Sequence, residues 1–382
     1  MKYFFIIFLT QVFSLNHSIE TKSLFSFKGE FFDGTPMGIP MNVSSFEDGS
    51  FILHENKVES VKLFSEDGTL EKVISQRGRG PGEFLDIDNI KVNNSGDIIV
   101  LDHKQLRISM FSKNGEVIDD YKVFRSRPRA RSIHHRKDSL YIFGSIRYSE
   151  LGNKTSTKLF FVTDQKFNRT GIEFGQSMEY TNEDSESLPS FVMAGGKRLS
   201  DNSVLLDNGD LLVSPMLYEG YLLLYTAQSD YQSHQIVNVE KYGKSYEEYE
   251  GTDRLNFDLV RKQGLSMLSN QAGRRIFYHF NRSLGLFKLN TGEILHFAQI
   301  KRGEEADLIV EFINEEGSKV IGIQTLRSIG DIDVKENTSK KDNHSRIDLV
   351  FHHMDKNNRL YVSRMGKDYV PELHVVQIKL NK

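Results

Sequence analysis

The chain has 382 residues, a formal net charge of −3 and no cysteine, which excludes disulfides, thiolate nucleophiles and cysteine-ligated metals. A charge this close to zero gives no general attraction to nucleic acid or to a membrane surface, so any electrostatic preference must be local. Hydrophobic residues make up 38% of the chain and include 27 Phe and 15 Tyr, which is enough apolar surface for a large core.

The N-terminus predicts export. Lys2 is followed by an apolar run that begins at Tyr3 and ends at Leu9, which fits a secretory signal and is too short to span a bilayer. We expect residues 1–18 to form a signal peptide that is cleaved near Ser14. The alternative is a buried N-terminal strand, since Phe and Ile also favour strands. No cysteine is present to carry a lipid, so we expect a periplasmic or extracellular protein that is not a lipoprotein and has no transmembrane segment.

Two copies of one strand module follow a leading segment of residues 20–41. The first spans residues 42–75 and the second 90–124, and each contains alternating apolar residues, two Gly-containing turns and a strand that ends in Phe. Gly49 and Gly96 occupy the same turn and are 47 residues apart. The same spacing separates Phe64 from Phe111 and Gly68 from Gly115. Four antiparallel strands in a repeat of about 40 to 50 residues are typical of a β-propeller blade.

A segment rich in glycine and proline joins the two modules. No helix or strand interior accommodates this density of Gly and Pro, so the segment is predicted to be a shaped loop at a blade junction. A phosphate cradle is the alternative, but the loop lacks the Lys-Ser/Thr pair and the helix that make such a cradle work. The predicted structural loop residues are Gly78, Gly80, Pro81, Gly82 and Phe84.

These residues carry a family resemblance over 42–124. The run from Gly78 to Phe84, followed by Ile98-Ile99-Val100, Asp102 and Arg107, resembles the pattern of NHL repeats. It is more similar still to the six-bladed β-propeller proteins of Bacteroidetes, many of them exported. The resemblance implies a propeller that binds a ligand or partner, and it implies no single reaction. Asp102 and Arg107 fit an ion pair or a turn clamp within the blade better than catalysis.

Four weaker copies of the module continue along the chain. The sequence therefore predicts an all-β protein, a six-bladed β-propeller of four-stranded antiparallel blades, as a single domain over 19–382. The predicted blades are residues 42–75, 90–124, 132–172, 203–238, 268–313 and 347–380. Because an open ring would expose a sheet edge, we expect the N-terminal segment to complete the last blade. Longer segments at 175–202, 239–265 and 333–346 interrupt the pattern, and such insertions form loops in repeat proteins.

A run of arginines joins the second predicted blade to the third. The candidate ligand-binding residues are Arg125, Arg127, Arg129, Arg131 and His134. Alternate residues of an extended chain share a face, so four guanidiniums would line up, and Arg binds carboxylate, sulfate or phosphate groups bidentately. The alternative is a solvated loop whose arginines pair with the acidic residues of the segment 179–186.

Histidine pairs at 134–135 and 352–353 raise the question of a metal. Adjacent residues of a strand point to opposite faces, so each pair offers one ligand per face, and no further ligand stands at a suitable spacing. The sequence therefore predicts no metal and no cofactor. Calcium is expected only if the protein is an enzyme of the lactonase type. Carboxylates that could then contribute are Glu83, Asp86 and Asp88.

Three functions remain open. The leading hypothesis is an exported, non-catalytic module that binds an anionic glycan or an envelope protein at one face of the ring. The second is a hydrolase or lyase that acts on a sugar or lactone at the mouth of the ring, for which no catalytic residue can be assigned. The third is RNA binding, as in some NHL propellers, and both the net negative charge and the export signal argue against it. The oligomeric state does not follow from the sequence.

Overall fold

The computed structural model describes the chain from residue 17 to residue 382, apart from several short segments. These segments are residues 57, 76, 123–128, 139, 147–157, 177–201, 216–217, 244, 249–264, 271–272, 280, 304, 336–337 and 342–343. Residues 1–16 of the predicted signal sequence and the acidic segment 179–186 lie outside the described residues. No helix among the described residues is long and apolar enough to cross a membrane.

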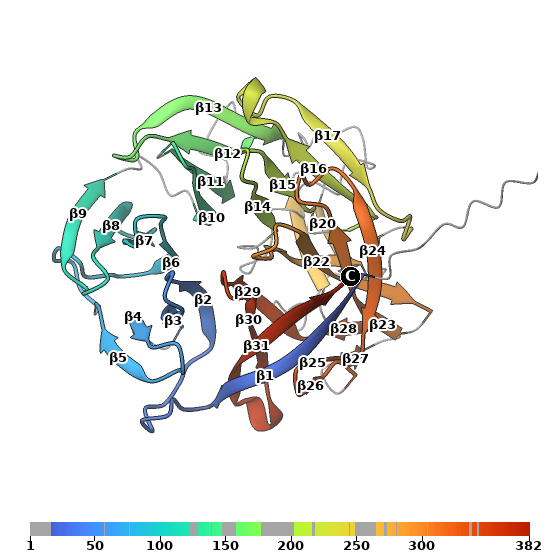
Figure 1. Cartoon of the computed structure of the whole chain (residues 1–382), viewed down its shortest axis with the longest axis horizontal. Helices are drawn as coiled ribbons and strands as arrows, with labels where there is room; N and C mark the ends of the chain where they lie inside the picture. Colours follow the sequence, from blue (N-terminus) through green and yellow to red (C-terminus); the bar gives the residue numbers. More distant parts are fainter. Residues whose placement is uncertain are drawn as a thin grey trace, which may run out of the picture.

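Six four-stranded antiparallel sheets stand around a common axis, as Figure 1 shows. Blade 1 contains β2 (Pro40–Ser45), β3 (Phe51–Glu55), β4 (Val58–Phe64) and β5 (Leu70–Val73). Blade 2 contains β6 (Ile87–Val92), β7 (Ile98–Asp102), β8 (Arg107–Phe111) and β9 (Val117–Lys122). Blade 3 contains β10 (Arg129–His135), β11 (Tyr141–Ile146), β12 (Lys158–Thr163) and β13 (Arg169–Gln176). In each of these blades the first strand lies innermost.

The second half of the ring repeats this order. Blade 4 contains β14 (Ser203–Leu205), β15 (Leu211–Val213), β16 (Tyr221–Tyr225) and β17 (His234–Asn238). Blade 5 contains β21 (Arg282–Lys288), β22 (Ile294–Arg302), β23 (Glu305–Ile313) and β24 (Val320–Leu326). Blade 6 contains β29 (Leu349–Met354), β30 (Arg359–Met365), β31 (Pro371–Asn381) and β1 (Ser18–Lys28). The helices of the described residues are two three-residue 3-10 turns, Ala227–Ser229 and Lys367–Tyr369. The expected six-bladed β-propeller is confirmed.

The N-terminal strand closes the ring. β1 pairs with β31 from Ser18 opposite Asn381 to Lys28 opposite Glu372, so the two ends of the chain share blade 6 (Figure 1). This pairing covers the edge that β31 would otherwise expose. The expectation that the N-terminal segment completes the last blade is confirmed.

The repeat of 47 residues is present in the strand register of blades 1 and 2. Ser45 pairs with Phe51 in blade 1, and Val92 pairs with Ile98 in blade 2. The partners of the second and third strands keep the same offset, with Phe51 opposite Phe64 and Ile98 opposite Phe111. Equal turns at equal spacing therefore set equal registers.

The fifth blade differs from its predicted range of 268–313, because the structure places it at β21–β24. The segment around Ile276 belongs to a separate three-stranded sheet made of β18 (Tyr246–Glu248), β20 (Gly273–His279) and β19 (Leu265–Asn270). The turn after β21 has the same Asn/Gly chemistry as the turns after third strands, so this turn does not show which strands of a blade it joins. The polar segment 333–346 also contains a hairpin, β27 (Thr338–Lys341) with β28 (His344–Ile347), and β25 (Ser328–Ile329) pairs with β26 (Ile332–Asp333).

The apolar core is divided into six clusters, one between each pair of neighbouring blades. Between blades 1 and 2, for example, Leu63 packs in one cluster with Phe84 and Phe111. The other five clusters fill the remaining interfaces in the same way. Because stacked sheets bury one face against the next, each blade depends on both neighbours.

The antiparallel strands give the ring two distinct faces. Turns between first and second strands and between third and fourth strands lie on one face, which we call the turn face. Links between second and third strands and between successive blades lie on the other, which we call the connection face. The glycine loop links blades 1 and 2, so it belongs to the connection face, and β10 begins at this face with Arg129.

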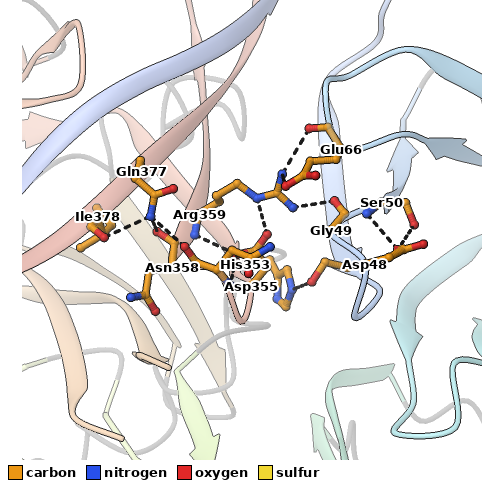
Figure 2. Close-up of polar contacts among 12 residues, drawn as sticks. Asp48, Gly49, Ser50, Glu66, His353, Asp355, Asn358, Arg359, Gln377 and Ile378 are labelled. Atoms are coloured by element: carbon orange, nitrogen blue, oxygen red, sulfur yellow. Dashed lines mark hydrogen bonds and ion pairs between the residues drawn. The ribbon is translucent and has the colours of Figure 1, made fainter. Parts of the chain in front are cut away.

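Polar contacts on the turn face join each blade to the next. At the ring closure the Arg359 Nε donates to Asp355 Oδ2 at 2.6 Å, Nη2 donates to the Gly49 carbonyl at 2.6 Å, and Nη1 lies 3.1 Å from Glu66 Oε1 (Figure 2). Gly49 has a φ of +89°, and a Cβ there would stand 2.6 Å from Arg359 Nη2, so only glycine fits. The other five junctions are joined by Lys113–Asp48, Asn94–His135, Arg136–Tyr231, Lys288–Asp207 and Asn290–Asn358.

Candidate functional site at the centre of the ring

The structure places the arginine run only in part. Arg125 and Arg127 lie outside the described residues, whereas the backbones of Arg129 and Arg131 belong to β10. The pairing of β10 with β11 shifts register between Ala130 and Ser132. This irregularity interrupts the strict alternation that would align Arg129 with Arg131. The common face expected for the four guanidiniums therefore does not follow from the backbone.

His134 lies near the other end of β10, on the inner edge of blade 3. Its Nε2 lies 2.9 Å from Ser203 Oγ, which belongs to the inner strand of blade 4. His134 keeps part of its surface exposed, but the protein packs closely around its ring. Burial and, to a smaller extent, the charge of Lys91 lower its pKa to about 3. His134 is therefore a neutral imidazole at ordinary pH.

His353 takes the same position on the inner strand of blade 6. Its Nε2 lies 2.8 Å from Ser45 Oγ, on the inner strand of blade 1. Burial, followed by the charge of Lys91, holds the pKa of His353 well below its usual value. Each of the two imidazoles thus reaches a serine of the next blade and stays neutral.

Lys91 supplies the positive charge of this region. Lys91 is half-buried on β6 and pairs with Ile99 on the second strand of its blade. The equivalent pairings are His134 with Ile142 in blade 3 and His353 with Tyr361 in blade 6. All three residues are the second from the turn face on their inner strands, so the register sets them at one height along the axis. We call Lys91, His134 and His353 the central group.

The central group combines a positive potential with neutral hydrogen-bonding rings. A neutral imidazole has one N–H donor and one acceptor nitrogen, and its tautomer follows its neighbours. Burial is the main cause of the lowered pKa of both histidines, and the charge of Lys91 lowers it further at both rings. The same potential favours an anion placed between them.

Metal ligands are not gathered in this region. Within the part of the chain that the structure describes, no three His, Asp or Glu side chains come together as a metal site would need. Of the carboxylates considered for calcium, Glu83 accepts the backbone N–H of Gly80 at 2.7 Å, and Asp86 lies 3.5 Å from His103 and 3.6 Å from Lys104. These two carboxylates serve the glycine loop and its surroundings.

The glycine loop is held by side chains of its own blade. Arg107 Nη1 donates to the Gly80 carbonyl at 3.1 Å, and Gln105 Nε2 donates to the Glu83 carbonyl at 2.8 Å. Asp102 Oδ2 accepts the backbone N–H of Leu85 at 2.6 Å. Gly82 has a φ of +71°, which favours glycine, and Phe84 is fully buried in the cluster between blades 1 and 2. Arg107 lies 3.5 Å from Asp120, so its ion-pair partner is not Asp102.

Sequence reasoning selected His134 but missed two members of the central group. The sequence raised His353 only as a possible metal ligand, and it gave no motif that indicated Lys91. Alignment of the two exact repeats places Lys91 where blade 1 has Ser44, and this replacement of a small polar residue by a charged one is the signal that could have revealed it.

Comparison with known proteins supports the fold. A family model described as 6-bladed beta-propeller (DUF5128) matches residues 30–197, and no curated protein matches the sequence. A solved member of the DUF4221 family from Bacteroides vulgatus is similar with a TM-score of 0.58 and 10% identity, over 96% of this chain and 100% of that chain.

Two further solved structures are similar over most of the chain. A protein of unknown function from Bacteroides thetaiotaomicron has a TM-score of 0.49 and 9% identity, over 95% of this chain and 77% of that chain. Virginiamycin B lyase from Staphylococcus aureus has a TM-score of 0.44 and 9% identity, over 95% of this chain and 99% of that chain. At such low identity the similarity speaks for the fold alone. The chain is a six-bladed β-propeller whose fold is similar to that of the DUF4221 family member from Bacteroides vulgatus.

Proposed function

We propose that this propeller is an exported binding module that holds an anionic sugar at the centre of its ring. The observation that carries the proposal is the register, which sets the cationic Lys91 level with two neutral imidazoles, His134 and His353, so that its positive potential lies among groups that form hydrogen bonds. The carboxylate of a uronic acid would take the position that this potential favours. Export rests on the apolar run that begins at Tyr3.

Neutral groups around Lys91 support a carbohydrate as the ligand. His134 and His353 are uncharged, and the hydroxyls of Ser203 and Ser45 stand next to them. Groups that both donate and accept hydrogen bonds suit sugar hydroxyls, whereas the single ammonium suits one acidic group. A ligand with one negative charge and several hydroxyls fits this set.

Calorimetric titration with glucuronate tests the proposal, with glucose as the uncharged comparison. We expect wild-type protein to bind glucuronate more tightly than glucose, and Lys91→Gln to weaken glucuronate by about 1.5 to 3 kcal/mol, the usual contribution of a hydrogen bond to a charged group. Lys356→Gln is the matched control, because Lys356 is exposed on the turn face. Equal affinity of wild type and Lys91→Gln, or no binding of glucuronate by folded protein, would reject the proposal.

A further inference from the structure

A buried histidine between blades 4 and 5 is bound to a carboxylate and to two hydroxyls. His296 on β22 lies directly opposite Glu311 on β23, and its Nδ1 is 2.6 Å from Glu311 Oε2. Its Nε2 lies 2.9 Å from Ser283 Oγ and 3.0 Å from Ser214 Oγ. Carboxylate, imidazole and hydroxyl thus follow one another in the order used by serine hydrolases.

Two tyrosines donate hydrogen bonds to the carboxylate. Tyr218 donates its hydroxyl to Glu311 Oε2 at 2.7 Å, and Tyr242 donates to Oε1 at 2.8 Å. Burial and the charge of Glu311 raise the pKa of both tyrosines, so both remain donors. The oxygens of Glu311 therefore act as acceptors, and His296 Nδ1, 2.6 Å from Oε2, is the donor on the imidazole side. The proton of His296 therefore sits on Nδ1, and Nε2 is left to accept from a serine.

Ser283 is the better placed of the two serines. Its side chain lies on the innermost strand β21 and is 6% exposed, against 1% for Ser214 and 0% for His296 and Glu311. Exposure thus increases from the acid to the hydroxyl, and in a triad only the hydroxyl must reach the substrate. Asn202 Oδ1 also accepts from Ser283 at 3.3 Å, but His296 Nε2 is closer.

We propose that Ser283 is the nucleophile of an acyl-transfer site for small esters, with His296 as general base and Glu311 as the group that orients it. The Ser283 oxygen bonds to the ester carbonyl carbon while its proton passes to His296 Nε2. The bond from that carbon to the alcohol oxygen then breaks, and the alcohol leaves with the same proton. Water cleaves the acyl-serine in the reverse manner and restores both groups. This site does not depend on Lys91.

Labelling with a small fluorophosphonate tests the proposal on the whole chain. We expect one adduct by intact mass, assigned to Ser283 by peptide mapping, together with an initial burst with p-nitrophenyl acetate. Ser283→Ala abolishes both signals, and Ser363→Ala, the matched control at a buried serine that contacts His352 in blade 6, retains them. Thermal unfolding establishes that each variant is folded.

The result that overturns the proposal is absence of an adduct on folded wild-type protein, or an adduct that persists in Ser283→Ala. An adduct mapped to Ser214 has the same consequence. Peptide mapping of the wild type keeps the test decisive even if a variant fails to fold. Glucuronate binding is measured separately, so failure of this site leaves the central group untouched, and the reverse holds as well.

Discussion

The turn face and the centre of the ring use charged side chains in different ways. On the turn face several cations meet anions, as Arg359 meets Asp355 and Glu66, and Lys113 meets Asp48. At the centre the charge of Lys91 acts on two neutral histidines and lowers the pKa of both. Ion pairs such as Arg359 with Glu66 and Lys113 with Asp48 join one blade to the next, whereas the charge of Lys91 lies level with two neutral imidazoles and adds a positive potential at the centre.

Removing Arg359 tests the structural side of this comparison most strongly. Arg359 is 3% exposed and Asp355 is also buried, so Arg359→Ala leaves a buried carboxylate without its cation. We expect a loss of about 3 to 5 kcal/mol in the free energy of unfolding, as found for broken buried ion pairs. Urea denaturation measures it. A loss below about 1 kcal/mol, the range of exposed pairs, would show that this contact does not hold the ring closed.

The central histidines predict how stability depends on pH. The pKa of His134 is about 3 in the folded protein, against the usual 6.5 when unfolded, so below pH 6.5 the unfolded chain binds a proton that the folded chain does not. The free energy of unfolding therefore has its full value above pH 6.5. As the pH drops toward the folded pKa of His134, this residue lowers the free energy of unfolding by about 1.4 kcal/mol per pH unit. His353 contributes in the same direction.

Chemical denaturation of His134→Gln between pH 7 and pH 4 checks this slope. The variant keeps a polar group beside Ser203 but loses the titration, so its stability should fall less steeply than that of the wild type. His234→Gln is the control, because His234 is exposed on the outermost strand of blade 4. Parallel curves for wild type and His134→Gln would contradict the lowered pKa.

Lys91→Met isolates the charge that the account assigns to the centre. Burial is the main cause of the lowered pKa at His134 and His353, and the charge of Lys91 is a smaller one. Loss of the charge should therefore raise the pKa of both histidines while leaving it below the usual value. Imidazole resonances followed by NMR over a pH titration report this change. Unchanged pKa values would mean that Lys91 does not act on the central group.

The smallest effect is expected at an exposed contact of the turn face. Lys113 and Asp48 are 37% and 60% exposed, so solvent screens their ion pair. We expect Lys113→Ala to change the free energy of unfolding by about 0.2 to 1 kcal/mol, in contrast to Arg359→Ala. A loss as large as that of Arg359→Ala would mean that burial does not separate the two classes of contact.

The sequence predicted those parts of the molecule in which local patterns set the structure. The repeat from Gly49 to Gly96 predicted blades 1 and 2 because equal turns fix equal registers. The predicted range of blade 5 differs from the structure because the turns between first and second strands and the turns between third and fourth strands contain the same residue types. A turn such as that around Gly292 therefore does not show which strands it joins.

Residues that meet only through tertiary packing escaped the sequence. Lys91, His134 and His353 come from three blades, and their common height depends on the register of each inner strand. His296 and Glu311 pair directly across two strands of blade 5, but Ser214, which contacts His296, comes from the neighbouring blade. No spacing along the chain encodes contacts of this kind.

The most direct test of the central claim is an NMR titration of His134 and His353 in the presence of saturating glucuronate. A carboxylate bound beside Lys91 stabilises the charged form of nearby imidazoles, so we predict that the pKa of both histidines rises on binding. The exposed His234 should not respond. If glucuronate saturates the protein while the pKa values of His134 and His353 remain unchanged, the anion binds elsewhere and the centre of the ring is not its site.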